Sequence, residues 1–219
     1  MTPQIRLVAT VLCLAAAGAL HAEKAPAPTR LLPVDQAASV PDFFSFRARL
    51  QAAVARHDTA AVLDVLAKDV KLSFGGDDGI EAFAPLWNPE ATDSRLWDTL
   101  ARVLALGGSF DAQGRFAAPY TYSRWPAGID VFSHVAAVGS GVRVRSAAEE
   151  AATIIGQLDF DIVPLADQSG ERTGWTAIKL PSGQIGHVHD QWVRSPIDFR
   201  VGFSKKAGRW QIDYFVAGD

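Results

Sequence analysis

The first hydrophobic pattern after residue 35 has the spacing of an α-helix. Its apolar positions, three or four residues apart, are Phe43, Phe46, Leu50 and Val54. This spacing predicts a helix with one buried stripe. Ser39, Pro41 and Asp42 supply a hydroxyl cap, a proline in the first turn and an acid near the positive end of the helix dipole, so we expect the helix to begin there.

The pattern stays helical as far as residue 66 and then changes to a period of two. Asp58 or Thr59 is the expected cap of a second, shorter helix. Residues 70–74 alternate apolar and polar side chains, which predicts a half-buried strand that ends at GGDDG, residues 75–79. Two further helical stretches follow, at residues 80–86 and 94–104.

The second half of the chain has the pattern of β-structure. Residues 110–128 are irregular, and a domain boundary is expected near their end. From Ile129 onward, short apolar stretches punctuated by glycine predict a small barrel. Two last strands, at residues 197–203 and 209–216, are expected to form a hairpin that pairs with the strand at 70–74. The predicted fold class is therefore α+β, with a helical N-terminal region, a small sheet and an inserted barrel.

Four segments of residues 137–193 follow one another in an order found in a known family. They are GVRVRS at 141–146, IIGQLDFDIV at 154–163, GWTAIKLPSGQIGHV at 174–188 and DQWV at 190–193. In this order they resemble the bacterial Src-homology-3 domain (SH3b type). The resemblance implies a small SH3-like β-barrel that binds a ligand and does not catalyse a reaction.

Three positions depart from the family pattern. Arg143 stands where asparagine is usual, SAAEEAA at residues 146–152 replaces a Ser-Gly-Pro loop, and His187 stands where an aromatic residue is frequent. Ser146 and Glu149 also have the spacing of a helix capping box. We expect formation of the barrel to override this helix propensity and to leave at most one turn of helix in the loop.

The remaining segments form a second unit around this barrel. The order helix, helix, strand and the closing GRWQIDYFVAGD resemble nuclear-transport-factor-2-like domains. The expected organisation is a signal peptide at residues 1–22, a linker at 23–34, a helix-rich α+β domain at 35–128, an SH3-like barrel at 129–194, and a C-terminal hairpin at 195–219 that completes the α+β domain.

The N-terminus has the layout of a signal peptide. Arg6 precedes an apolar run over residues 7–20, and small residues follow it. The run is shorter than the roughly 20 residues that span a bilayer, so cleavage after Ala22, or alternatively after Ala19, is expected. Cys13 is not in a lipoprotein acceptor context. We therefore expect a periplasmic or secreted protein that is soluble after cleavage and has no membrane span.

The composition excludes several kinds of functional site and argues against one class of partner. Removal of the first 22 of the 219 residues leaves 197 with no cysteine, which excludes disulfides, thiolate metal sites and cysteine nucleophiles. The formal net charge is −3, or −4 without Arg6, and argues against nucleic acid as a partner. A hydrophobic content of 48% suffices for a folded core. The sequence leaves the oligomeric state open.

Two clusters could suggest a metal site. His187 and His189 lie two apart on a predicted strand and share a face, but Asp190 points to the opposite face, so a third ligand is lacking. GGDDG with Glu81 gathers carboxylates without the spacing of an EF-hand. Asp78 is expected to favour the helix start instead. No metal site and no cofactor are therefore predicted.

No catalytic residue can be assigned. The sequence lacks a Gly-x-Ser-x-Gly elbow, Ser-x-x-Lys, a phosphate-binding glycine loop and His-Glu-x-x-His, which favours binding over catalysis. The candidate ligand-binding residues are Phe160, Trp175, His187, His189 and Trp192. The alternative is that the aromatic members only fill the barrel. Arg143 and Arg145 share a strand face and are either an anion-binding patch or ordinary solvated charges.

Two functional hypotheses follow. In the first, the barrel of an exported protein contacts peptidoglycan or an envelope protein, and the α+β part is a scaffold. In the second, the α+β part is a small-molecule-binding or hydrolytic domain with Trp87 and Trp97 lining a pocket, and a non-catalytic barrel targets it.

Overall fold

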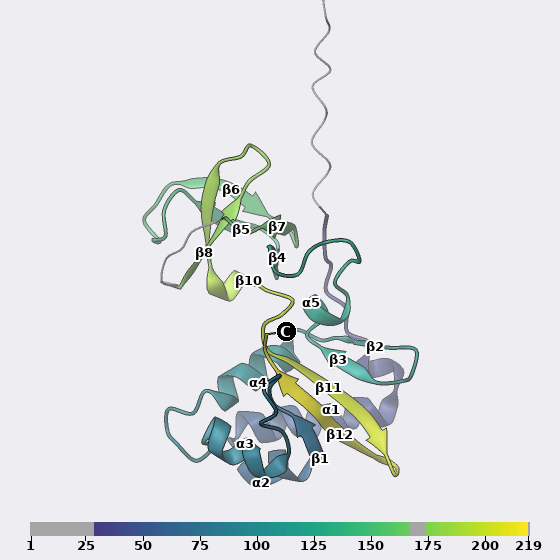
Figure 1. Ribbon diagram of the computed structural model, residues 1–219. Coiled ribbons are helices and arrows are strands. Elements are labelled where there is room, and N and C mark those ends of the chain that lie inside the picture. The colour runs from purple at the N-terminus through teal and green to yellow at the C-terminus, as the bar shows by residue number, and fades with distance from the viewer. Residues whose placement is uncertain (1–28, 167–173, 219) are drawn as a thin grey trace, which may run out of the picture.

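The computed structural model describes residues 29–166 and 174–218. The signal peptide expected over residues 1–22, including Cys13, lies outside the described residues. Within them the chain has the predicted α+β class, with helices and several small sheets (Figure 1).

The N-terminal helices lie close to their predicted positions. They are the 3-10 helix η1 (Ala37–Ser39) and the α-helices α1 (Pro41–Ala55), α2 (Thr59–Asp64), α3 (Ile80–Trp87) and α4 (Leu96–Ala105). Asp58 caps α2 as expected, because its Oδ1 accepts from the Ala61 amide at 3.0 Å. Ser39 does not cap α1. Its hydroxyl instead donates to the Gln36 carbonyl at 2.7 Å, within the turn that forms η1.

A five-stranded sheet packs against these helices. Its spatial order is β1 (Leu66–Lys71), β12 (Arg209–Val216), β11 (Arg200–Lys206), β3 (Phe116–Ala118) and β2 (Ser109–Phe110). β1 runs parallel to β12, and the other pairs are antiparallel. The expected pairing of the C-terminal hairpin with the N-terminal strand is thereby confirmed.

Two predictions about this sheet were wrong, namely the bounds of its first strand and the irregular character of residues 110–128. The first strand begins at Leu66 and ends at Lys71, because Leu66 and Ala67 are buried with Val70, whereas Phe74 lies beyond the strand and is exposed. The region expected to be irregular contains β2, β3 and the short helix α5 (Tyr120–Ser123). Strands of two and three residues are too short to produce a recognisable alternation.

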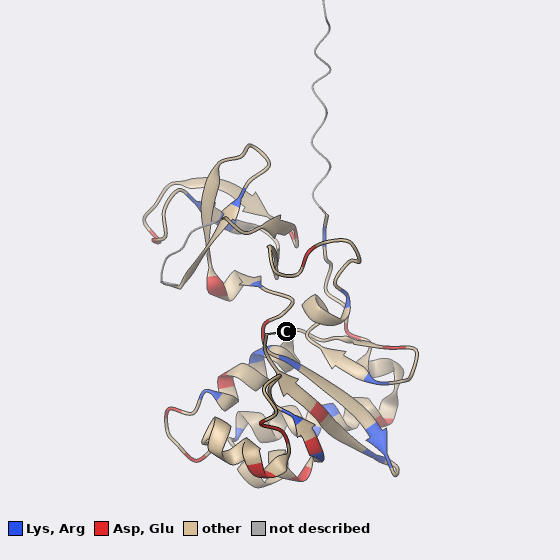
Figure 2. Ribbon diagram, in the orientation of Figure 1, with Lys and Arg blue, Asp and Glu red and all other residues tan. Residues whose placement is uncertain are grey.

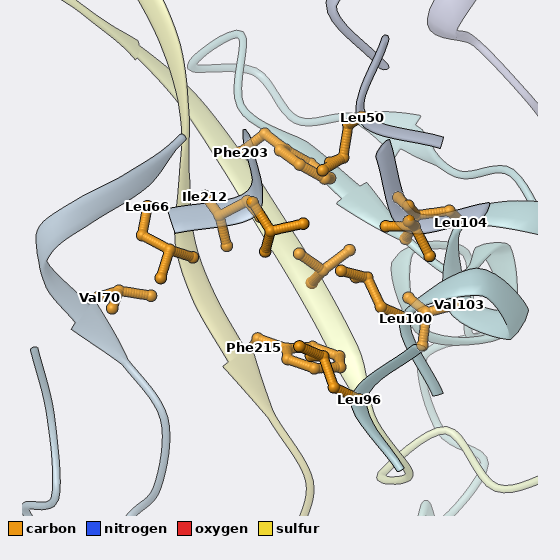
Figure 3. Close-up of a cluster of buried hydrophobic side chains, with 14 of the residues drawn as sticks. Leu50, Leu66, Val70, Leu96, Leu100, Val103, Leu104, Phe203, Ile212 and Phe215 are labelled. Atoms are coloured by element: carbon orange, nitrogen blue, oxygen red, sulfur yellow. The ribbon is translucent and has the colours of Figure 1, made fainter. Parts of the chain in front are cut away.

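The core of this α+β region fills the space between helices and sheet. Figure 3 shows side chains of α4, such as Leu96 and Leu100, meeting Phe215 of β12. Phe43 of α1 contacts the ring of Phe116 with centroids 4.5 Å apart. The residues expected on the buried stripe of α1 are therefore core residues.

Tyr214 covers part of the opposite face of the sheet. A Cβ added to Gly202 would lie 2.0 Å from the ring of Tyr214, so this tyrosine packs directly on the glycine. Burial raises the pKa of the Tyr214 hydroxyl above its usual value. The buried Arg200 has its guanidinium 5.0 Å from the ring centre of Tyr122 and 5.5 Å from that of Phe74.

The inserted region forms two small sheets. One has the order β10 (Val193–Arg194), β4 (His134–Ala137) and β7 (Ile162–Pro164). The other has the order β6 (Ile154–Leu158), β5 (Val142–Arg145), β9 (Ile185–His189) and β8 (Trp175–Lys179).

These two sheets enclose one core without closing into a barrel over the described residues. A bridge between Leu165 and Ile178 joins them. Their shared core combines Val135 and Val163 of one sheet with Val144, Ile178 and other residues of the other. The SAAEEAA loop has no helix, in line with the expectation of at most one turn, and its ends are joined by a hydrogen bond from the Ser146 amide to the Thr153 carbonyl.

The described part of the expected linker is not a free tether. The Leu31 amide donates to the Phe160 carbonyl at 2.8 Å, and the Ile162 amide donates to the Thr29 carbonyl at 2.8 Å. Leu31 is buried with Tyr120 and Ile162 in a third cluster. The apolar Leu31 thus fixes this segment to the inserted region.

None of the helices in residues 29–166 and 174–218 combines the length and the apolar character needed to cross a membrane.

Candidate binding groove

The hairpin β8–β9 brings two of the expected ligand-binding side chains together. Trp175 is the direct cross-strand partner of His189. Their ring centroids are 5.2 Å apart and the rings are inclined at 70°, an edge-to-face contact. Both side chains are only partly buried, so this contact does not remove them from solvent.

Trp192 lies beside this pair. It ends the 3-10 helix η2 (Asp190–Trp192), and 47% of its surface is exposed. A groove of about 340 Å³ runs between these rings and strand β5. Its lining comprises Ser140, Gly141, Val142, Arg143, Arg145, Glu150, Trp175, His189, Gln191 and Trp192.

Strand β5 adds two cations to the groove. Val142 and Val144 are buried, so Arg143 and Arg145 occupy the outer face, as the alternation predicted. One guanidinium nitrogen of Arg145 donates to the Ala152 carbonyl at 2.9 Å. Arg143 is exposed, and its guanidinium has no hydrogen bond or ion pair with any described residue. In Figure 2 basic and acidic positions are interspersed along the ribbon.

The turn before β5 is held by a carboxylate that the sequence reading did not single out. Asp159 Oδ1 accepts from the Ser140 hydroxyl at 2.6 Å and from the Gly141 amide at 2.7 Å. The Ser140 bond, followed by the Gly141 bond, lowers the pKa of Asp159 below its usual value. Asp159 therefore shapes one wall of the groove. An aspartate that follows a strand carries no sequence signal for a partner 18 residues earlier.

His187 does not line the groove, although it is on the same strand as His189. It is paired with Ala177 and Arg145 on the neighbouring strands, and its Nδ1 is buried without a partner in the described part of the chain. His189 Nδ1 accepts from the Gln191 amide at 3.3 Å. No group of three or more metal-ligating side chains occurs among the described residues.

Phe160 also lies outside the groove. It occupies the turn between β6 and β7 with φ of 59°, a value that is uncommon for a residue with a side chain. Its amide donates to the Gly139 carbonyl at 3.0 Å and its carbonyl accepts from Leu31. Phe160 therefore lies where the chain turns, and the structure does not bring it together with Trp175 and Trp192 in this groove.

Asp78, in the acidic turn after β1, connects this turn to the end of the strand. Asp78 Oδ1 accepts from the Leu72 amide at 3.0 Å, and Asp78 is 3.3 Å from Lys71 Nζ. The Leu72 bond is the largest cause of the lowered pKa of Asp78. Gly79, with φ of 95°, is the N-cap of α3, so Asp78 does not cap that helix.

Trp87 and Trp97 do not share a pocket. Trp97 is buried, stacks on His57 with centroids 4.9 Å apart, and donates from Nε1 to the Pro89 carbonyl at 3.1 Å. It is a core residue whose polar atom has a partner. Trp87 alone lines a cavity.

Comparison with known proteins identifies no similar protein. No family model, no curated protein and no solved structure matches this chain.

Proposed function

We propose that this protein is an exported binding protein of the cell envelope and that the groove around Trp175 and Trp192 contacts peptidoglycan or an envelope protein. The observation that carries the proposal is the grouping of Trp175, His189 and Trp192 in one open groove with Arg143, whose guanidinium has no partner among the described residues. The signal-peptide pattern and the SH3b resemblance of the sequence support the same location and type of activity.

The chemistry of the groove suits recognition of a chain with flat or cyclic units and carboxylates. Exposed indole rings offer a large contact area at a small cost in conformational entropy. An unpaired guanidinium can bind a carboxylate with two parallel hydrogen bonds. Peptidoglycan offers both sugar rings and carboxylates, and an acidic protein segment offers the latter.

The groove's hydroxyl and imidazole each have another hydrogen-bond partner. Ser140 donates its proton to Asp159, and His189 accepts from the Gln191 amide. Neither side chain is hydrogen-bonded to the other as a nucleophile and base would be.

The proposal is tested by co-sedimentation with purified peptidoglycan sacculi. We expect Trp192→Ala to reduce retention about tenfold, because an exposed aromatic anchor commonly contributes more than 1 kcal/mol to binding. Phe132→Ala is the matched control, since Phe132 is a large, 60% exposed apolar residue outside the groove.

Equal loss in both variants would contradict a role for the groove. If the wild-type protein is not retained, peptidoglycan is the wrong partner. A photo-crosslinker at position 192 then tests the envelope-protein alternative, which fails if no crosslinked species forms in the periplasm.

A further inference from the structure

A second groove, of about 600 Å³, lies in the α+β region. It is bounded by the end of β1, helix α3, the start of α4 and the C-terminal end of β12. Its apolar lining is Leu72, Phe74, Leu86, Trp87, Ala91, Phe199 and Ala217. None of these residues belongs to the Trp175–Trp192 groove, so the two sites are independent.

The base of this groove is an aromatic stack. Trp87 is only 8% exposed, and its ring lies 4.8 Å from Phe215 with an interplanar angle of 18°. Phe199 contacts both of these rings, at 5.1 and 5.3 Å. Such packing holds the base rigid, which is typical of a preformed small-molecule site.

The rim exposes large apolar side chains to solvent. Phe74 is 53% exposed and Leu86 is 54% exposed. Both line the groove, Phe74 from the segment after β1 and Leu86 from α3. Apolar side chains exposed together beside a cavity are a common mark of a ligand site.

The polar side chains at the groove are Ser73, Asn88, Asp93, Ser94 and Arg95. Arg95 is exposed, and its guanidinium has no partner within the described chain. Arg95 is also the N-cap residue of α4 and supplies no side-chain cap. The backbone N–H groups of this ten-residue helix add partial positive charge there, which Asp98 in the first turn partly offsets.

One carboxylate also lies at the groove. Asp93 lines it and is exposed. Arg95 lies at the start of α4, where the free backbone N–H groups add partial positive charge, so this end of the groove favours a ligand that brings acceptor oxygens.

We propose that this groove binds a small amphipathic carboxylate. Its apolar chain would lie along Phe74, Leu86 and Trp87, and its carboxylate would lie near Arg95 at the start of α4. This binding is additional to the envelope contact proposed above and does not depend on it.

The test is isothermal titration calorimetry of the full mature chain with decanoate, below its critical micelle concentration. Saturable binding of one decanoate per chain is expected. Decyltrimethylammonium, which has the same chain with the opposite charge, should bind at least about tenfold more weakly. Saturable binding of both with equal affinity, or of neither, would overturn the proposal.

Substitutions at the rim separate the groove from non-specific binding. Leu86→Glu should weaken decanoate binding at least about tenfold, because it removes apolar surface and adds repulsion. Ile154→Glu is the matched control, an exposed apolar residue of β6 far from the groove in the fold, and should bind decanoate like the wild type. Equal weakening in the two variants would show that the fatty chain binds elsewhere. Circular dichroism verifies that each variant is folded.

The two rim charges test where the carboxylate lies. Arg95→Gln should weaken decanoate binding about fivefold, and Asp93→Asn should leave it unchanged or strengthen it. The reverse order of these two variants would overturn the assignment of Arg95 as the carboxylate partner.

Discussion

At the scale of single residues, the sheet depends on one position where a side chain is missing. Gly202 lies in the central strand β11, and its direct partner across the β11–β12 pair is Tyr214. The tyrosine ring occupies the space in which a Cβ would be placed. The glycine therefore allows a large aromatic residue to cover the outer face of the sheet, as occurs where an aromatic side chain protects a strand glycine.

Gly202→Ala is expected to lower the free energy of unfolding by about 1–3 kcal/mol, because the new methyl group collides with the Tyr214 ring. Gly156→Ala is the matched control in another strand. Its Cβ would have contacts no closer than 3.6 Å and should change stability by less than about 1 kcal/mol. Urea denaturation of the two variants measures the difference. Equal stability would show that Tyr214 moves aside without cost.

At the scale of elements, periodicity located the helices but not every strand. The stripe of apolar residues at 43–54 lies within α1, and all of its members are buried. β2 and β3 escaped detection because two or three residues cannot display a period of two. β3 is positioned by hydrogen bonds to β11, whose residues come about 85 positions later, such as Phe203 paired with Phe116, and β2 in turn pairs with β3.

Only part of the candidate groove could be predicted, because some of its contacts also join residues that are distant in sequence. A β-hairpin pattern places Trp175 opposite His189, and Trp192 follows shortly after, so local sequence indicated these three. The wall at Ser140 and Gly141 depends on Asp159, which is distant in sequence. The sequence does not indicate that Phe160 has a positive φ and lies in a turn outside the groove.

The turn at Ser140 and Gly141 provides a prediction at this scale. Asp159→Ala removes both acceptor bonds, so retention on the groove's ligand should fall several-fold, whereas Asp159→Asn keeps one acceptor oxygen and should lose less. Co-sedimentation of both variants measures this. Identical retention of Asp159→Ala and wild type would show that the turn holds its shape unaided.

The lowered pKa of Asp159 predicts how ligand binding in the groove should respond to pH. The folded-state pKa of Asp159 is lowered from 3.8, so its stabilising contribution is complete above that value and is lost as the pH falls through the lower folded pKa. Between about pH 5 and pH 8 this group should therefore cause no change in binding.

At the scale of the whole molecule, the inserted sheets enter and leave the α+β region through adjacent strands. β3 precedes the insertion and β11 follows it, and Ala118 is paired with Val201. Figure 1 shows most of the inserted sheets lying away from the helices α1–α3. One link is the third cluster, in which Tyr120 meets Ala136 and Ile162, and a pocket between the end of α4 and β10 marks a second.

Replacement of residues 126–196 by a short Gly-Ser linker should leave the α+β region folded. The strand ends that the linker must join are neighbours in one sheet, and the 23-residue main cluster contains no residue of the excised segment. We expect a cooperative thermal transition at lower temperature than in the full chain, because Tyr120 and Leu31 lose their partners. Loss of cooperative unfolding would show that the inserted sheets are needed for the fold.

The parallel pair of β1 and β12 sets the order in which the chain can reach its final state. β1 is complete at residue 71, but its partner begins only at residue 209. During synthesis or export, Leu66 and Val70 therefore stay uncovered until β12 has been made, while the inserted sheets have all their partners earlier. Closing contacts of such long sequence separation is slow. A nascent chain should thus expose an uncovered apolar strand edge until β12 is available for pairing, and chaperones or proteases would meet it in that interval.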